Sequence, residues 1–180
     1  MSHKKINVVV AGATGYVGLD LVYYLSKHPR VSISNLCAQK NLGQNIKFFD
    51  NRIKKKLPKI SKLKSVNWHK VDLLFLSLPN GEAQKLVKSL FRFKHLKFID
   101  LSADFRIKDS HKYKQWYSTT HKAKHLIKDS IYSIPEFTKE KIKKFRIIAN
   151  PGCYPTSIQL ALIPLLKKSL INNKNITIEI

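Results

Sequence analysis

Residues 6–18 read INVVVAGATGYVG and indicate the fold of the whole chain more clearly than any other segment. The first five form a short, mostly β-branched run, which is typical of a buried strand. Three glycines follow at a spacing of three residues, Gly12, Gly15 and Gly18. Apolar side chains then recur at helical spacing through residues 19–25. A strand, a glycine turn and a helix in this order predict the first unit of a parallel α/β sheet.

The glycine turn also predicts a dinucleotide site. Glycines let a backbone turn tightly and approach a pyrophosphate, which then lies at the N-terminus of the helix. The spacing Gly-x-x-Gly-x-x-Gly differs from the more familiar Gly-x-Gly-x-x-Gly, but the physical reason for the glycines is the same. The alternative is a glycine-rich turn with no ligand. The candidate cofactor-binding residues of this segment are Gly12, Ala13, Thr14, Gly15, Tyr16, Val17 and Gly18.

The end of the next predicted strand, residues 31–36, bears on which dinucleotide binds. An NAD site usually has an acidic residue here that holds the ribose 2′-hydroxyl, and this chain has none. Gln39 and Lys40 stand there instead, and a lysine can neutralise a 2′-phosphate. We therefore expect NADP(H) in preference to NAD(H). The alternative is that Lys40 is only a solvated loop residue in a lysine-rich chain.

Strands and helices are predicted to alternate along most of the chain, which is the pattern of a doubly wound parallel sheet of the Rossmann type. Residues 40–70 and 105–130 lack periodicity, and we expect them to be connections with little regular structure. The alternating residues 175–180 predict one further strand. The other predicted elements are strands at 71–78, 96–101 and 145–149 and a helix at 82–93.

A second informative segment is residues 150–156, which read NPGCYPT. It predicts a tight turn carrying Cys153, followed by an apolar helix that Thr156 and Gln159 open as a capping box. The positive end of a helix dipole stabilises a thiolate, and the thiolate is the nucleophilic form of cysteine. The alternative is a buried cysteine that packs as a small apolar residue.

The chain of 180 residues is strongly basic, with 34 Lys and Arg against 11 Asp and Glu and a net charge of +23. Such an excess can indicate a nucleic-acid or membrane partner. Here the lysines are scattered and no nucleic-acid-binding signature is visible, so we expect neither partner and interpret the charge as compositional drift. A basic nucleic-acid-binding module stays as a weaker alternative. Two cysteines, Cys37 and Cys153, and no apparent signal peptide favour a cytoplasmic protein without disulfides, and we expect no metal.

Five segments in order resemble the N-acetyl-gamma-glutamyl-phosphate reductase family over nearly the whole chain. The two most specific are DLSADFR at 100–106 and NPGCYPT at 150–156; the others are 12–18, 76–81 and 134–136. Aspartate-semialdehyde dehydrogenases resemble this architecture too, but they differ around the cysteine and rank second.

The resemblance implies two domains. Residues 1–150 would form an NADP-binding Rossmann domain, and residues 151–180 would begin an α+β catalytic and dimerisation domain. The family continues for well over a hundred residues more, so we expect a truncated catalytic domain that lacks the family's acid/base histidine. A homo-oligomer is expected if that domain is complete.

The resemblance also implies the chemistry, which is NADPH-dependent reduction of N-acetylglutamyl 5-phosphate to the 5-semialdehyde with release of phosphate, in arginine biosynthesis. Cys153 would carry the acyl group as a thioester. Pro79 would contact the cofactor, and Arg106 and Ser102 would bind the substrate, although Arg106 could instead pair with a neighbouring aspartate. The alternative functions are a catalytically impaired NADP-binding remnant and an aspartate-semialdehyde-dehydrogenase-like reductase.

Overall fold

A parallel sheet forms the centre of the molecule. The computed structural model describes residues 4–179, and within them seven strands pair in the order β3-β2-β1-β4-β5-β7-β6, with every pair parallel. The strands are β1 (Ile6–Ala11), β2 (Val31–Cys37), β3 (Ile60–Ser61), β4 (Leu73–Leu76), β5 (Lys97–Asp100), β6 (Ser130–Tyr132) and β7 (Ile147–Ala149).

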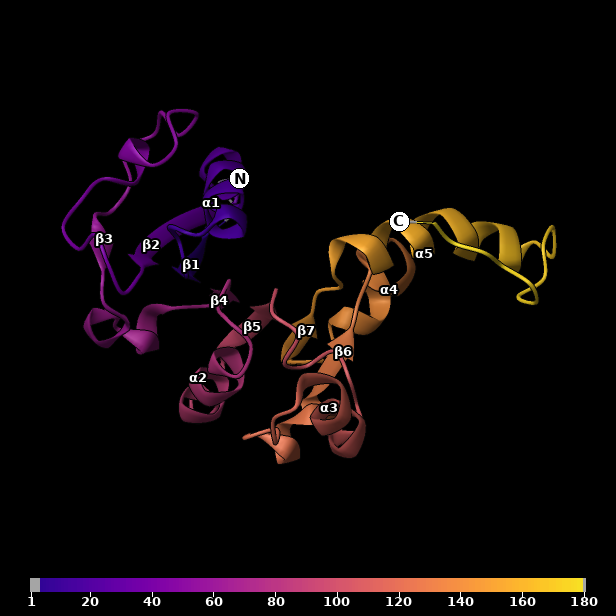
Figure 1. The fold of residues 1–180 in the computed structure, drawn as a ribbon. Coiled ribbons are helices and arrows are strands. Elements are labelled where there is room, and N and C mark those ends of the chain that lie inside the picture. The colour runs from indigo at the N-terminus through magenta and orange to yellow at the C-terminus, as the bar shows by residue number, and fades with distance from the viewer. Residues whose placement is uncertain (1–3, 180) are drawn as a thin grey trace.

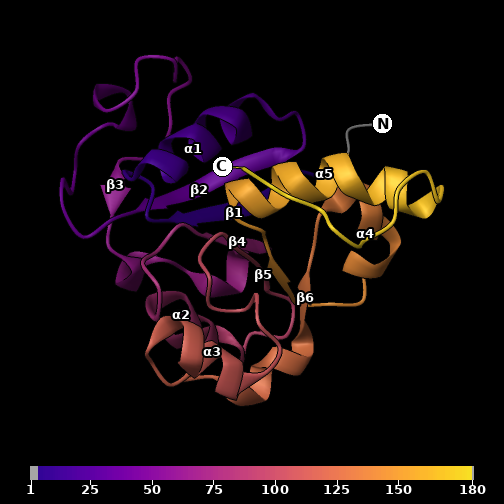
Figure 2. The same ribbon diagram turned by 45° about the vertical axis from the view of Figure 1, so that its right-hand side comes forward.

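Helices cover both faces of this sheet, with α1 on one side and α2 on the other (Figure 1, Figure 2). The α-helices are α1 (Tyr16–Lys27), α2 (Glu82–Leu90), α3 (Ser110–Tyr117), α4 (Pro135–Ile142) and α5 (Cys153–Lys167). The short 3-10 helices are η1 (Ile46–Phe48), η2 (Leu63–Ser65), η3 (Trp68–Lys70) and η4 (Lys124–Asp129).

The pleat of the central strand β1 divides the core into two clusters. Val8 and Val10 belong to the cluster that contains Val22 of α1. Val9 belongs to the cluster that contains Val87 of α2. Successive side chains of a strand point to opposite faces, so one uniformly apolar strand supports a helix layer on each side.

The connections reverse direction at β1, because the chain passes to β2 on one side of it and later to β4 on the other. In an open α/β sheet, the crevice at the carboxyl ends of such neighbouring strands is where ligands bind. The doubly wound parallel fold predicted from the sequence is thereby confirmed. The predicted strands near β2, β4, β5 and β7 and the helix at α2 are also present, with bounds that differ by a few residues.

The structure differs from the sequence prediction in three segments. Residues 105–130 contain α3, which Asp109 caps through its carboxylate, and Tyr113 of this helix is fully buried. Neither β6 nor α4 was predicted, because both are short and lie in polar, lysine-rich sequence. The strand expected at 175–180 is absent over 175–179, while Ile180 lies outside the described residues.

Helix α5 extends away from the sheet, at the right of Figure 1. None of its residues is buried, and neither core cluster includes a side chain from it. The half-buried Ile158, Leu162 and Leu166 lie along one side of the helix. The two hydrophobic core clusters that stabilise the sheet therefore contain no side chain from Cys153 onward.

Candidate cofactor and thiol site

The three glycines of the first turn meet different steric conditions. Gly12 has a φ of +82°, and a Cβ there would lie 1.8 Å from the carbonyl oxygen of Ser77. A Cβ on Gly18 would lie 2.1 Å from the carbonyl oxygen of Gly12. A Cβ on Gly15 would make only an ordinary contact of 3.6 Å. Gly12 and Gly18 are thus required by the fold itself, whereas Gly15 is not.

The N-terminus of α1 follows this turn directly. Gly15 is its N-cap residue, and no side chain caps the helix. The first N–H groups of a helix have no intrahelical acceptor, and they carry the positive end of the helix dipole. Tyr16, the first helical residue, is 95% exposed. This helix end is open to an anion such as a pyrophosphate.

A cavity of about 770 Å³ lies at the carboxyl ends of β1, β2 and β4. Three segments that follow these strands line it, together with the start of the segment after β3 and one side of α2. The lining residues are Gly12, Thr14, Gly15, Cys37, Ala38, Gln39, Lys62, Leu63, Ser77, Leu78, Pro79, Glu82, Lys85, Leu86 and Ser89.

The structure brings together only part of the cofactor site expected from the sequence. Five of the expected residues line the cavity: Gly12, Thr14, Gly15, Gln39 and Pro79. Ala13 and Gly18 are buried beneath it, and Tyr16, Val17 and Lys40 are exposed and do not line it.

Lys62 and Cys37 line the cavity although neither was expected there. No local motif marks Lys62, since it enters the site through the pairing of β3 with β2. Cys37 could have been found, because it is the last residue of a strand that leads into the site.

The residues present fit a nicotinamide dinucleotide. The turn at residues 12–15 leaves no room for a side chain on Gly12, and it leads into an uncapped helix end. The acidic lining residue, Glu82, is paired with Lys85 at 2.6 Å and lies on α2, away from the end of β2. No lining residue from the segments after β2 and β3 is acidic, so the 2′-hydroxyl partner typical of an NAD site is not provided there.

Cys153 lies on the same edge of the sheet as this cavity. It lies four residues after Ala149, the last residue of β7, and Gly12 and Ser77 come directly after the ends of β1 and β4. Parallel strands end at one edge, and β1 and β7 are three strand spacings apart, or roughly 14 Å at about 4.8 Å per spacing. The thiol and the glycine turn therefore share one edge of the sheet, although Cys153 does not line the cavity.

The local structure at Cys153 corrects the prediction of a capping box. The helix begins at Cys153 itself, with Gly152 as its N-cap residue. Thr156 lies inside the first turn, where its Oγ1 donates to the carbonyl oxygen of Gly152 at 2.8 Å. Gln159 donates to the carbonyl oxygen of Pro155 at 2.9 Å. A proline is tolerated in the first turn because its missing N–H would have no intrahelical acceptor there, so the helix can begin before Pro155.

Cys153 is exposed, unlike Cys37, which is 1% exposed. Burial raises the pKa of the Cys37 thiol to about 11. The two thiols therefore have opposite surroundings, and the exposed one is at the helix N-terminus.

Arg106 holds the turn that precedes Cys153. Its Nε donates to the carbonyl oxygen of Asn150 at 2.8 Å, and its Nη2 donates to that of Leu101 at 3.0 Å. A Cβ on Gly152 would lie 3.3 Å from Nη1, which makes no hydrogen bond to any residue in the range 4–179. Within that range Arg106 has no ion pair with Asp104 or Asp109, the alternative role considered for it.

A buried carboxylate network underlies the 100–106 motif. Asp100 accepts hydrogen bonds from the backbone N–H and the hydroxyl of Ser102 and from the N–H of Phe105. Burial raises the pKa of Asp100 to about 6. The Ser102 hydroxyl donates to Asp100 at 2.7 Å and accepts from the N–H of Asp104 at 3.2 Å. Ser102 is thus engaged inside the loop.

Asp104 connects this network to the cavity wall. Its carboxylate accepts from the N–H groups of Gly81 and Gln84, at the start of α2, and from the hydroxyl of Tyr113 at 2.8 Å. Arg106, two residues later, holds the cysteine turn. One motif therefore fixes both the N-terminus of α2 and the turn before Cys153.

His121 lies in the segment 105–130, which was expected to be a connection with little regular structure, and its side chain is nevertheless buried, at 2% exposure. Its Nε2 lies 2.8 Å from the carbonyl oxygen of Asp104, and its Nδ1 accepts from the N–H of Ala123 at 3.1 Å. Burial lowers the pKa of this imidazole. Both ring nitrogens are thus engaged with the backbone of the neighbouring segments.

Two kinds of feature are absent from the part of the chain that the structure describes. It contains no group of three or more His, Cys, Asp or Glu side chains placed to hold a metal ion. It also contains no helix long and apolar enough to cross a membrane.

Comparison with known proteins matches residues 7–145 to the family described as semialdehyde dehydrogenase, NAD binding domain. A protein of Arabidopsis thaliana named probable N-acetyl-gamma-glutamyl-phosphate reductase, chloroplastic, is 41% identical over 98% of this chain and 44% of its own length. A protein of Ehrlichia ruminantium named N-acetyl-gamma-glutamyl-phosphate reductase is 43% identical over 97% of this chain and 50% of its own. The chain spans about half the length of the curated relatives it matches.

Solved structures of low sequence identity share the fold. An aspartate semialdehyde dehydrogenase II of Vibrio cholerae superposes with a TM-score of 0.68 at 21% identity, covering 91% of this chain and 47% of that one. The enzyme of Candida albicans, solved with NADP, has a TM-score of 0.60 at 19% identity, covering 92% of this chain and 48% of that one.

Proposed function

The chain belongs to the family of the semialdehyde dehydrogenase NAD-binding domain, and on that premise we propose that it acts in the NADPH-dependent reduction of N-acetylglutamyl 5-phosphate to the 5-semialdehyde. The single observation that carries the proposal is the placement of two features on one sheet edge. The glycine turn and its cavity lie at the ends of β1, β2 and β4, and an exposed cysteine begins a helix after β7.

The proposed chemistry begins at the Cys153 sulfur. The thiolate attacks the carbonyl carbon of the acyl phosphate, the bond from carbon to the phosphate oxygen breaks, and phosphate leaves with the electron pair. A thioester on Cys153 remains. NADPH, when bound, supplies a hydride to the thioester carbon. The C–S bond then breaks, which releases the semialdehyde and returns the thiolate.

The residues around Cys153 are placed to support these steps. The first N–H groups of α5 can donate to the negative charge that develops on the carbonyl oxygen during attack, as the backbone N–H groups of an oxyanion hole do. Arg106 keeps the turn of residues 150–152 in place through two hydrogen bonds to backbone carbonyls. We propose that its remaining nitrogen, Nη1, contacts an anionic group of the substrate, because guanidinium groups bind carboxylates and phosphates well.

Ser102 has a different proposed role from the substrate contact expected at first. Its hydroxyl is buried and already bonded on both sides within the loop. We propose that it supports the conformation of this loop rather than touching substrate.

The substrate and pathway rest on the relatives. Curated proteins that are 41% and 43% identical carry the reductase name, whereas the aspartate semialdehyde dehydrogenase structures are 18–22% identical. This difference supports N-acetylglutamyl phosphate over aspartyl phosphate as the substrate, and we propose a role in arginine biosynthesis on the same ground. A thiol nucleophile must stay reduced, so the proposal includes a reducing compartment such as the cytoplasm.

The test follows NADPH oxidation by the purified chain with N-acetylglutamyl phosphate. Activity is expected to depend on the acyl phosphate and to disappear in Cys153→Ala with NADPH affinity unchanged, while Ser157→Ala, at an exposed position of the same helix, serves as the control. Faster turnover of aspartyl phosphate would support the dehydrogenase-like alternative. Cofactor binding without turnover of either substrate would support the NADP-binding remnant.

A further inference from the structure

A lysine side chain, Lys62, lies at the edge of the cavity beside β2 because β3 pairs with β2. We propose that Lys62, and not Lys40, binds the 2′-phosphate of NADPH and sets the preference for NADPH over NADH. This inference rests on the proposed function, since it assigns one contact within the same cofactor site.

The pairing of β3 with β2 places Lys62 at the expected position of the adenosine ribose. In the parallel register, Leu36 pairs with Ile60 and Cys37 with Ser61. The N–H of Ala38 then donates to the carbonyl oxygen of Ser61 at 3.1 Å, which holds the two exiting segments together. Lys62 comes next and lines the cavity, as Gln39 does from the other segment. The loop after the second strand of a Rossmann fold is where the ribose is recognised.

The backbone at Lys62 is anchored, so its side chain leaves from a defined point. Lys62 is the N-cap residue of η2, and its carbonyl oxygen accepts from the N–H of Ser65 at 3.1 Å. The Ser65 hydroxyl donates to the same oxygen at 2.7 Å. The lysine is exposed at the cavity mouth, where a ligand can reach it.

The charges around the cavity single out Lys62 among its cations. Lys85, the other lysine of the lining, is 2.6 Å from Glu82. Lys62 has no ion pair with any residue between 4 and 179, so its charge is available to a ligand. Lys40 follows Gln39 in sequence but does not line the cavity. An ammonium group is a compact point charge suited to a phosphate.

The experiment measures the affinity of the chain for NADPH and for NADH by titration, comparing wild type with Lys62→Met. Methionine keeps much of the apolar stem and removes the charge. We expect about tenfold weaker NADPH binding, as for the loss of one charge-assisted hydrogen bond, with NADH affinity unchanged. Lys62→Arg should retain most of the NADPH affinity.

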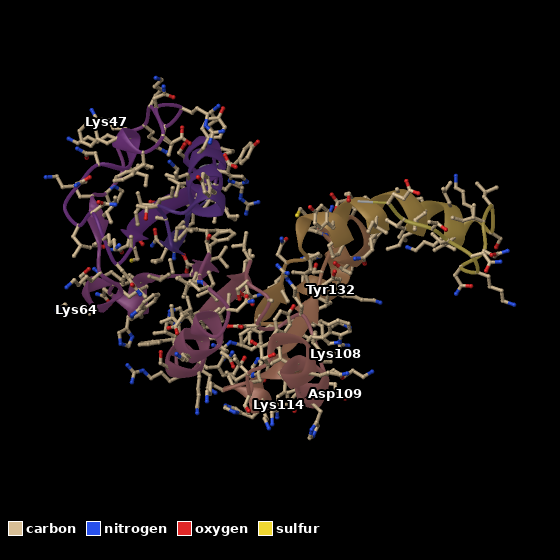
Figure 3. All side chains as sticks on the ribbon, in the orientation of Figure 1. Lys47, Lys64, Lys108, Asp109, Lys114 and Tyr132 are labelled. Carbon is tan, nitrogen blue, oxygen red and sulfur yellow. The ribbon has the colours of Figure 1, made fainter. Side chains whose placement is uncertain are left out.

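Two matched controls carry the same change nearby. Lys64→Met removes a lysine two residues away that projects at the periphery of η2 in Figure 3, and Lys40→Met removes the lysine suggested by the sequence. Both should bind NADPH as wild type does. Equal weakening of both cofactors in Lys62→Met, no weakening there, or a NADPH-specific loss in Lys40→Met would each overturn the inference while leaving cofactor binding intact. A wild-type chain that binds neither cofactor would overturn the proposed function as well.

Discussion

At the scale of single residues, the glycines between β1 and α1 differ in why they are needed. Some are required by the packing of the protein itself, and one is not. Gly12 is held at a positive φ against the end of β4, and Gly18 packs α1 onto the turn. A Cβ on Gly15 would make only an ordinary van der Waals contact within the protein. The protein interior therefore requires two of the glycines, and the third is available to a ligand.

Alanine substitutions should separate these roles. Gly12→Ala and Gly18→Ala should each lower the free energy of unfolding by about 2–4 kcal/mol, through backbone strain and overpacking. Gly15→Ala should change it by less than about 1 kcal/mol. Gly15→Val should remain folded and lose NADPH binding, because its larger side chain would occupy the space that the pyrophosphate needs. Urea unfolding and NADPH titration measure the two effects, and a Gly12→Ala protein as stable as wild type would contradict the structure of the turn.

The two thiols should differ strongly in reactivity. Cys37 is buried with a pKa of about 11, so at pH 8 on the order of one thiol in a thousand is ionised. Cys153 is exposed. Brief treatment with iodoacetamide near neutral pH, followed by peptide mapping, should label Cys153 much faster than Cys37. Preferential labelling of Cys37 would argue against Cys153 as the nucleophile.

Asp100 should leave a signature in the pH dependence of stability. Its folded pKa of about 6 is above the unfolded value of about 3.9, so the folded state binds more protons between these pH values. Its stabilising contribution to the free energy of unfolding is fully present below about pH 4 and is lost as the pH rises through 6. The free energy of unfolding changes by roughly 3 kcal/mol over this range. The lowered pKa of His121 acts in the opposite direction, since the unfolded state then holds more protons.

Asp100→Asn isolates this contribution, because the His121 effect is common to both proteins. The free energy of unfolding of wild type minus that of Asp100→Asn should fall between pH 4 and pH 7. A pH-independent effect of the amide would shift this difference by a constant and leave its slope unchanged. Chemical denaturation across this range measures the difference. A difference that is flat or rises with pH would show that Asp100 does not titrate as its burial implies.

At the scale of secondary-structure elements, the helix that begins at Cys153 is weakly supported by the rest of the described chain. Helix α5 has no buried residue and contains Pro164, which interrupts its hydrogen bonds. The central strands β1 and β4 are buried on both faces. The glycine turn is therefore carried by the rigid core, while Cys153 is held chiefly by Arg106 and the turn before it.

Native-state hydrogen exchange should show this contrast. Amides of α5 should exchange through local opening at a much lower free energy than those of β1 and β4, which should approach the global value. Mass spectrometry of peptides from the exchanged chain gives both values in one experiment. Equal protection of α5 and β1 would mean that α5 packs more firmly than this structure shows.

At the scale of the whole molecule, the sequence predicts what depends on local pattern. The β-branched run before Gly12 and the apolar strand near Leu74 are sufficient to predict a parallel sheet buried on both faces, because patterning and turn chemistry agree there. Gln39 was expected at the site because it follows a predicted strand, whereas Pro79 was expected there from the family resemblance, and both line the cavity.

Features that depend on long-range pairing could not be predicted. Lys62 reaches the cavity only because β3, two residues long, pairs with β2 across an irregular segment. Asp104 appears in a recognisable motif, but its bonds to Gly81 and Tyr113 join segments far apart in sequence. Helix α3 was missed because its polar sequence buries a single residue, Tyr113.

The most direct test of the proposed function is the transfer of an acyl group to Cys153. The chain is incubated with N-acetylglutamyl phosphate without NADPH, quenched in acid and digested, and its peptides are examined by mass spectrometry while released phosphate is measured. The proposal predicts an acyl group on the peptide containing Cys153, phosphate released in equal amount, and neither in Cys153→Ala, while Cys37→Ala behaves as wild type. Unmodified Cys153 in the wild-type chain, or equal phosphate release by Cys153→Ala, would contradict the proposal.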